Sequence, residues 1–164
     1  MSAVARLMGN AMYNHEPDNY DCPFCRLANG QDTDLSSDDV IFHDEDVTAF
    51  VSLHWRPNNP GHVLVVPNKH YENVFDLPPE LGVPIQRAVR NVAMAMKAAY
   101  GCDGVSTVQH NEPHGNQDVW HYHLHVFPRY VDDNLYGSRR RLTTAEERRL
   151  YAEKLREALS SPAS

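Results

Sequence analysis

The sequence has no long apolar run. None of its segments approaches the roughly 18 to 20 consecutive apolar residues that cross a bilayer, and residues 1–10 lack the apolar core of a signal peptide. We therefore expect a cytoplasmic protein without a membrane partner. With 164 residues, 41% of them hydrophobic and 23% charged, the chain has the size and composition of one globular domain with a proper core.

Basic residues are scarce. Lys and Arg number 15 against 22 Asp and Glu, so the formal net charge is −7. Proteins that bind nucleic acid broadly show clustered Lys and Arg, and we therefore expect no nucleic-acid partner. The single basic cluster, Arg139-Arg140-Arg141, stands just before a predicted helix. We interpret this cluster as the solvated start of that helix.

Cysteine is also rare, with three residues in the chain, too few for a disulfide framework. Cys22 and Cys25 have the Cys-x-x-Cys spacing, which in a reducing compartment indicates metal ligation or redox chemistry. No thioredoxin-like βαβ pattern surrounds the pair, so metal ligation is favoured. Because a structural zinc site is closed by four ligands, the two thiolates would need two more.

Three histidines alternate in one short segment, at His121, His123 and His125. Side chains on a β-strand repeat every two residues, so the three imidazoles would face one way and the apolar residues between them the other. The pattern predicts a half-buried strand that displays its rings into a site. Neutral imidazoles in such a site could bind a transition metal, or they could bind and attack a phosphate.

Three segments carry a family resemblance. Residues 117–130 contain His-x-His-x-His followed by two apolar residues. Residues 60–70 contain an apolar strand and then a turn that ends at His70. Residues 21–25 contain the cysteine pair. In this order they resemble the C-terminal motif, the preceding strand and the N-terminal metal-binding pair of the histidine triad (HIT) family of nucleotide hydrolases and transferases. The zinc-containing branch of that family is the best match.

The resemblance implies two sites. Structural zinc, the one cofactor we expect, would be held by Cys22, Cys25, His70 and His121. His123 would be the catalytic nucleophile, attacking the α-phosphorus of a nucleotide ester, anhydride or phosphoramidate to give a covalent nucleotidyl-histidine.

The same resemblance implies a set of phosphate- and nucleotide-binding residues: His125, His62, Asn111, Gln117, Asp118 and Ser52. Two of them depart from the family pattern. Asp118 stands where many members have serine, and an ionised carboxylate there would repel phosphate. Ser52 stands where an acidic residue commonly binds the ribose hydroxyls.

The chain is expected to form a flexible N-terminal arm over residues 1–20 and a single HIT-like domain over 21–164, with its core motifs in 21–131. Strands are predicted at 40–43, 47–51, 62–67, 105–110 and 121–128. A long helix is predicted to end at Tyr100, before Gly101, and a C-terminal helix to cover about residues 143–160. The fold class is therefore α+β, with one mainly antiparallel twisted sheet of about five strands covered by helices.

Together these features predict a nucleotide hydrolase or nucleotidyltransferase that acts on a purine nucleotide derivative. Its substrate could be a dinucleoside polyphosphate, a phosphoramidate or another nucleotide ester. The resemblance also implies a homodimer. Two alternatives stay open: a metallohydrolase with its metal on the histidine triad, and a nucleotide-binding regulatory module with little turnover.

Overall fold

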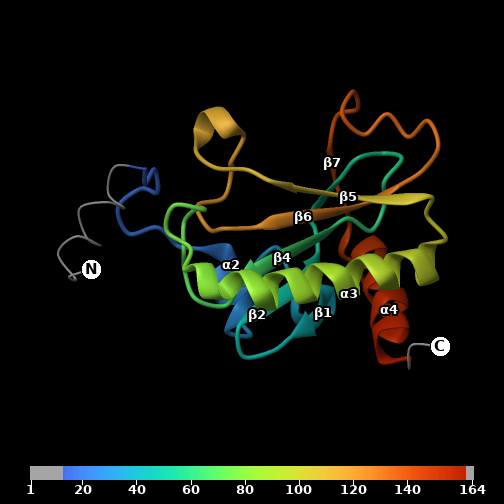
Figure 1. The fold of residues 1–164 in the computed structure, drawn as a ribbon, viewed down its shortest axis with the longest axis horizontal. Helices are drawn as coiled ribbons and strands as arrows, with labels where there is room; N and C mark the ends of the chain where they lie inside the picture. The colour runs from blue at the N-terminus through green and yellow to red at the C-terminus, as the bar shows by residue number, and fades with distance from the viewer. Residues whose placement is uncertain (1–12, 162–164) are drawn as a thin grey trace.

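The computed structural model describes residues 13–161 (Figure 1). Most of the predicted N-terminal arm, residues 1–12, lies outside the described residues. Residues 13–20 contact the loop after β4: the backbone carbonyl of Tyr13 accepts a hydrogen bond from Asn73, and Glu72 accepts one from the backbone of His15. The ring of Tyr13 also packs against Phe75, with 4.6 Å between the ring centroids.

A five-stranded antiparallel sheet forms the centre of the molecule, with the strand order β1-β2-β4-β6-β5. Its strands are β1 (Val40–His43), β2 (Val47–Val51), β4 (Val63–Pro67), β5 (Gly104–Gln109) and β6 (Leu124–Arg129). Together with the helices beside it, this sheet confirms the expected α+β fold.

Two helices cover one face of the sheet (Figure 1). The long helix α3 (Gly82–Tyr100) follows a short 3-10 helix, η2 (Pro79–Leu81), and ends at Gly101, whose φ of 62° is the left-handed conformation that glycine adopts without strain. The C-terminal helix α4 (Ala145–Ser160) begins with a capping box between Thr144 and Glu147. Both predicted helices are thus confirmed.

The opposite face of the sheet carries the short helix α2 (Pro23–Ala28). Successive residues of a strand point to opposite faces. Val63 and Val65 of β4 accordingly pack with the α3 side, whereas Leu64 and Val66 pack with α2. Because both faces are covered, all five residues of β4 are buried, which explains its continuous apolar sequence.

The triad strand is shorter than predicted. β6 begins at Leu124, so His121 and His123 precede it. The backbone there leaves the ladder because His121 N–H donates to the carbonyl of Val119, and Tyr122 N–H donates to a loop carbonyl at Tyr71. The side chains still alternate between the two faces as expected, because Tyr122, between His121 and His123, packs in the core on the α3 side.

Two further strands were not predicted. β3 (His54–Trp55) and β7 (Arg141–Leu142) pair antiparallel as a separate two-stranded sheet. Each is two residues long, too short to show the alternation by which strands are recognised in sequence. Two 3-10 helices complete the described fold, η1 (Ser37–Asp39) and η3 (Pro113–Gly115).

No helix among residues 13–161 is long and apolar enough to cross a bilayer.

Candidate functional site

Four potential metal ligands converge: Cys22, Cys25, His70 and His121. Their ligand atoms all lie within 4.8 Å of one another. The sulfur of Cys22 is 3.2 Å from Nδ1 of His121, and the sulfur of Cys25 is 3.2 Å from Nδ1 of His70. These separations are close to the S···N edge of roughly 3.5 Å expected in a tetrahedral zinc site. The donor set and its spacing therefore fit zinc.

Outer hydrogen bonds orient both histidines of this cluster. The Nε2 atom of His121 lies 2.9 Å from the carbonyl oxygen of Pro67, and because a carbonyl can only accept, that nitrogen carries the ring proton. Nδ1 of His121 is then free to bind a metal. Glu16 lies 2.7 Å from Nε2 of His70 and favours the same arrangement there. Sequence reasoning did not find Glu16, because this residue lies in the segment predicted to be a flexible arm.

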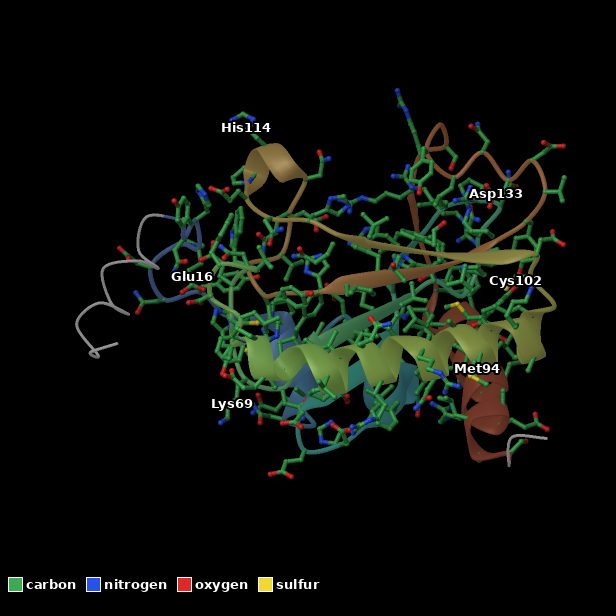
Figure 2. The ribbon with its side chains drawn as sticks, viewed as in Figure 1. Glu16, Lys69, Met94, Cys102, His114 and Asp133 are labelled. Atoms are coloured by element: carbon green, nitrogen blue, oxygen red, sulfur yellow. The ribbon has the colours of Figure 1, made fainter. Side chains whose placement is uncertain are left out.

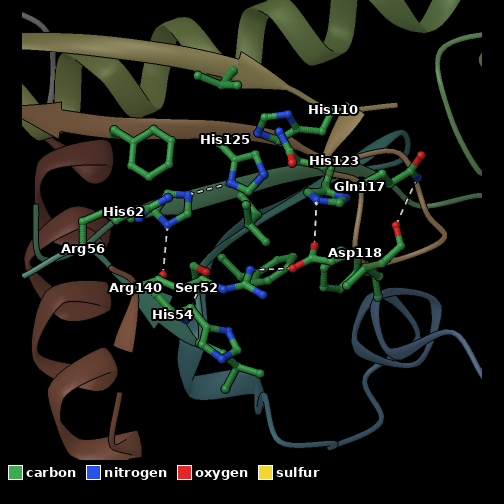
Figure 3. A pocket seen from close by; sticks show the side chains of 18 of the residues that line it. Ser52, His54, Arg56, His62, His110, Gln117, Asp118, His123, His125 and Arg140 are labelled. Carbon is green, nitrogen blue, oxygen red and sulfur yellow. Dashed lines mark hydrogen bonds and ion pairs between the residues drawn. The ribbon is translucent and has the colours of Figure 1, made fainter. Parts of the chain in front are cut away.

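His123 is buried and its ring has a defined orientation. Its Nδ1 atom lies 2.7 Å from the carbonyl oxygen of His121, which can only accept, so Nδ1 carries the proton. In the neutral ring the Nε2 atom therefore has a free lone pair. This nitrogen faces Asp118, whose nearer oxygen is 4.0 Å away (Figure 3).

His62 and His125 form a hydrogen-bonded relay beside His123 (Figure 3). Nδ1 of His62 donates to the carbonyl of His54 at 3.2 Å, so Nε2 of His62 must accept from Nδ1 of His125, at 2.9 Å. The ring of His125 lies 4.9 Å from that of His123. The relay thus fixes the ring of His125 next to His123 and leaves the Nε2 atom of His125 without a proton.

Burial keeps these imidazoles neutral. The pKa of His62 is lowered to about 3, chiefly because burial disfavours the charged ring. Burial also lowers the pKa of His123 and of His125 below the ordinary histidine value. A neutral His123 retains the lone pair that a nucleophile needs.

The rings open into a cavity of about 1200 Å³. One part of its lining is apolar and includes Phe24, Leu35 and Leu64. Other lining residues are polar and include Arg139 and Arg140, from the segment after β6. A cavity with an apolar compartment and a few polar groups around the reactive rings is typical of a small-molecule site.

Most of the predicted binding residues line this cavity: His62, His125, Gln117, Asp118 and Ser52. The amide of Gln117, however, already bonds backbone, donating to the carbonyls of Glu72 and Val119 and accepting from Glu112 N–H. Gln117 therefore shapes the loop that borders the cavity.

The structure does not bring Asn111 to the cavity. Its Oδ1 atom accepts from the backbone N–H of Val74 at 2.8 Å, and its Nδ2 atom donates to the side chain of Gln109. These bonds join the end of β5 to the loop before α3. A residue that caps a strand end and one that holds phosphate look alike in sequence, because both need a short polar side chain after the strand.

His110 and Arg140 are among the residues that line the cavity and that sequence reasoning missed. His110 follows β5 directly, and its ring lies 5.4 Å from that of His125. The predicted strand 105–110 ends at His110, and its place next to the triad strand could have indicated this residue from the sequence. From the sequence, Arg140 is interpreted as part of a solvated helix start. In the structure its guanidinium donates a hydrogen bond to Asp118 at the cavity. That placement depends on the β3–β7 pairing.

Asp133, labelled in Figure 2, lies in the segment that leads from β6 to the cavity-lining arginines. Asp133, after β6, accepts two hydrogen bonds from Arg129, at 2.7 and 2.9 Å, and one from the backbone of Leu135. The bonds from Arg129 lower the pKa of Asp133 well below its usual range. This buried carboxylate fixes the start of the segment that carries Arg140.

Comparison with known proteins agrees with this geometry. The HIT domain family model matches residues 35–132. An uncharacterized HIT-like protein of Methanocaldococcus jannaschii is 36% identical over 112 residues, which are 68% of this chain and 81% of that protein. The purine nucleoside phosphoramidase of Escherichia coli is 30% identical over 89 residues, 54% of this chain and 73% of the enzyme.

A zinc-bound histidine triad family protein from Mycobacterium smegmatis has the same fold. The two structures superpose with a TM-score of 0.72 at 30% sequence identity, covering 85% of this chain and 94% of the other. Sequence, fold and the arrangement of the histidines all agree, and the chain belongs to the HIT family.

Proposed function

We propose that this protein is a nucleotide hydrolase or nucleotidyltransferase that forms a covalent nucleotidyl-histidine on His123. One observation carries the proposal: the hydrogen bond from Nδ1 of His123 to the carbonyl of His121 leaves a free lone pair on Nε2, at the wall of the cavity. The substrate class is a purine nucleotide derivative, in keeping with the phosphoramidase of Escherichia coli to which the chain is similar.

In the proposed reaction, Nε2 of His123 attacks the α-phosphorus, and the bond from phosphorus to the leaving group breaks. The electron pair of that bond departs with the leaving group. Water then attacks the same phosphorus, breaks the bond to His123 and releases the nucleoside monophosphate. An alcohol or phosphate acceptor in place of water would give a transferase.

His125 would stabilise the phosphoryl charge. An anionic phosphate near its Nε2 atom favours the protonated ring, which can then donate to a phosphoryl oxygen. The relay through His62 keeps that nitrogen aimed at the site. A fixed donor of this kind contributes about 2.7 to 4 kcal/mol when it meets charge that develops in the transition state. Ser52, at the cavity wall, is the proposed ribose contact.

Removing the ring of His123 should abolish this chemistry. For His123→Ala we expect turnover of adenosine 5′-phosphoramidate to fall by at least about 10³-fold, because the variant lacks the proposed attacking nitrogen. Steady-state kinetics measure the fall, and calorimetry should show that the variant still binds the nucleotide.

The matched control is His43→Ala, which removes a histidine of β1 that does not line the cavity. This control should keep wild-type turnover. Near-normal activity in His123→Ala, or a loss of activity that follows loss of metal, would contradict the assignment of the nucleophile.

We also propose that Cys22, Cys25, His70 and His121 hold one zinc ion. The zinc would join the α2 segment, the turn after β4 and the start of the triad segment, and it would hold geometry without taking part in the reaction. The zinc-bound protein of Mycobacterium smegmatis supports this proposal.

Elemental analysis of the purified protein should give one zinc per chain. In a Cys22→Ser/Cys25→Ser variant we expect the zinc content to fall close to zero and the fold to loosen, because serine is a poor zinc ligand. Cys102→Ser is the control: Cys102 is buried outside the cluster, so zinc should be retained. Full zinc content in the double variant would contradict the proposed ligands.

A metal on the triad itself is disfavoured by the geometry. The cluster that could hold a metal among residues 13–161 includes His121 but neither His123 nor His125.

A nucleotide-binding module with little turnover is the second candidate function, and Asp118 favours it because this carboxylate stands in front of the nucleophile. Tight nucleotide binding without a covalent adduct would support that second candidate.

Asp118 should narrow the choice of leaving group. A carboxylate 4.0 Å from the attacking nitrogen repels an anionic group that leaves from the same phosphorus. For Asp118→Ser we expect kcat/KM for diadenosine triphosphate to rise about threefold or more relative to adenosine 5′-phosphoramidate. Asp118→Asn should act in the same direction, since it removes the charge at constant size. An unchanged ratio in both variants would show that the carboxylate points away from the substrate.

Finally, we propose that the protein is a homodimer. β5 lies at one end of the sheet order, and its outer side pairs with no other strand of the described residues. An edge strand of this kind can pair with a second copy. Light scattering should give twice the chain mass of 18.7 kDa at micromolar concentration, whereas a monomer mass would contradict the proposal.

A further inference from the structure

Three consecutive arginines, Arg139, Arg140 and Arg141, have different surroundings in the folded chain. Arg141 pairs with Glu147 in the first turn of α4, as expected of a solvated helix start. Arg139 and Arg140 instead line the cavity that holds the triad. All three arginines are exposed to solvent, but Arg139 and Arg140 also border the cavity, whereas Arg141 does not.

The segment that carries Arg140 is fixed at both ends. Before it, the buried carboxylate of Asp133 binds Arg129. After it, β7 pairs with β3, and Thr143 donates to the carbonyl of Leu53 through both its N–H and its hydroxyl. Backbone pairing thus sets where Arg140 stands, beside the cavity.

The guanidinium of Arg140 is linked to the nucleophile through one carboxylate. Its Nη1 atom donates to Oδ2 of Asp118, while Oδ1 of Asp118 is 4.0 Å from Nε2 of His123 (Figure 3). A group attached to a phosphorus atom at Nε2 would lie between these side chains. Arg140 is therefore within reach of the leaving group.

Fixed positive charge in the cavity comes from arginine. The hydrogen bond between His62 and His125 needs one ring nitrogen without a proton, and burial lowers the pKa of both rings, so this pair supplies no fixed charge. The arginines that line the cavity are Arg56, Arg139 and Arg140. Arg56 donates to the backbone carbonyl of Ser138 and so helps to hold the segment. Arg140 contacts the residue that faces the nucleophile.

We infer that Arg140 is a specificity-determining residue that binds an oxyanion leaving group, such as sulfate or phosphate, attached to the α-phosphorus. On binding, the guanidinium exchanges the carboxylate of Asp118 for an oxygen of the leaving group. When Nε2 of His123 attacks, the bond from phosphorus to the bridging oxygen breaks, and the electron pair leaves with the oxyanion beside Arg140. This inference rests on the proposed function.

The test compares two substrates that share an adenylyl group. Adenosine 5′-phosphosulfate releases an anion, whereas adenosine 5′-phosphoramidate releases ammonia. In Arg140→Gln we expect kcat/KM for the phosphosulfate to fall roughly five- to tenfold, and kcat/KM for the phosphoramidate to change less than about twofold. Arg141→Gln is the matched control, because it removes a neighbouring arginine that does not line the cavity, and it should leave the ratio unchanged.

Binding gives a readout that does not depend on turnover. In a His123→Ala background, Arg140→Gln should weaken calorimetric binding of the phosphosulfate by a similar factor and leave binding of the phosphoramidate unchanged. Asp118→Ser should shift the preference in the opposite direction, because it frees Arg140 for the substrate.

Two results would overturn the inference. An equal fall for both substrates in Arg140→Gln would give Arg140 a general structural role, and an unchanged ratio would place it outside the leaving-group site. Failure of the proposed function looks different: wild-type protein would form no adenylyl-histidine with either substrate.

Discussion

The site depends most on the hydrogen bond between Nδ1 of His123 and the carbonyl of His121. This bond selects the tautomer in which Nε2 of His123 has a free lone pair, and it gives the ring one orientation. His121 acts twice, since its carbonyl orients the ring of His123 while its own ring joins the cysteine cluster. The proposed zinc would therefore stabilise the position of His123 through the backbone of a single residue, without contact with the substrate.

The sheet supplies the rest of the environment. Because both faces of β4 are covered, His62, just before that strand, and His123 beside it are buried, and burial lowers the pKa of both rings. Neutral rings can attack phosphorus but provide little fixed charge for an anionic substrate. The arginines of the segment after β6 supply positive charge to the cavity. The carboxylate of Asp118, which faces His123, carries the opposite charge and weakens their effect there.

The sequence predicted the features that follow a simple period or a strong motif. Alternating histidines indicated the site, apolar periodicity indicated α3, and the capping box at Thr144 indicated the start of α4. Features that depend on tertiary contact were less accessible. The early end of the triad strand comes from hydrogen bonds to distant loops, and the position of Arg140 comes from a pairing of two-residue strands. For Asn111 the sequence pattern was misleading. Its place after β5 suits a phosphate contact, but its side chain forms hydrogen bonds with Val74 and Gln109 instead.

Mapping the covalent adduct tests the central claim most directly. Wild-type protein would be quenched in acid-free conditions during turnover of a labelled adenylyl substrate, digested and analysed by mass spectrometry, because a phosphorus–nitrogen bond to histidine is sensitive to acid. The account predicts one adenylyl group per site, on the peptide that contains His123 and on that residue alone. Turnover with no adduct, or an adduct on His125 or on any other residue, would contradict it.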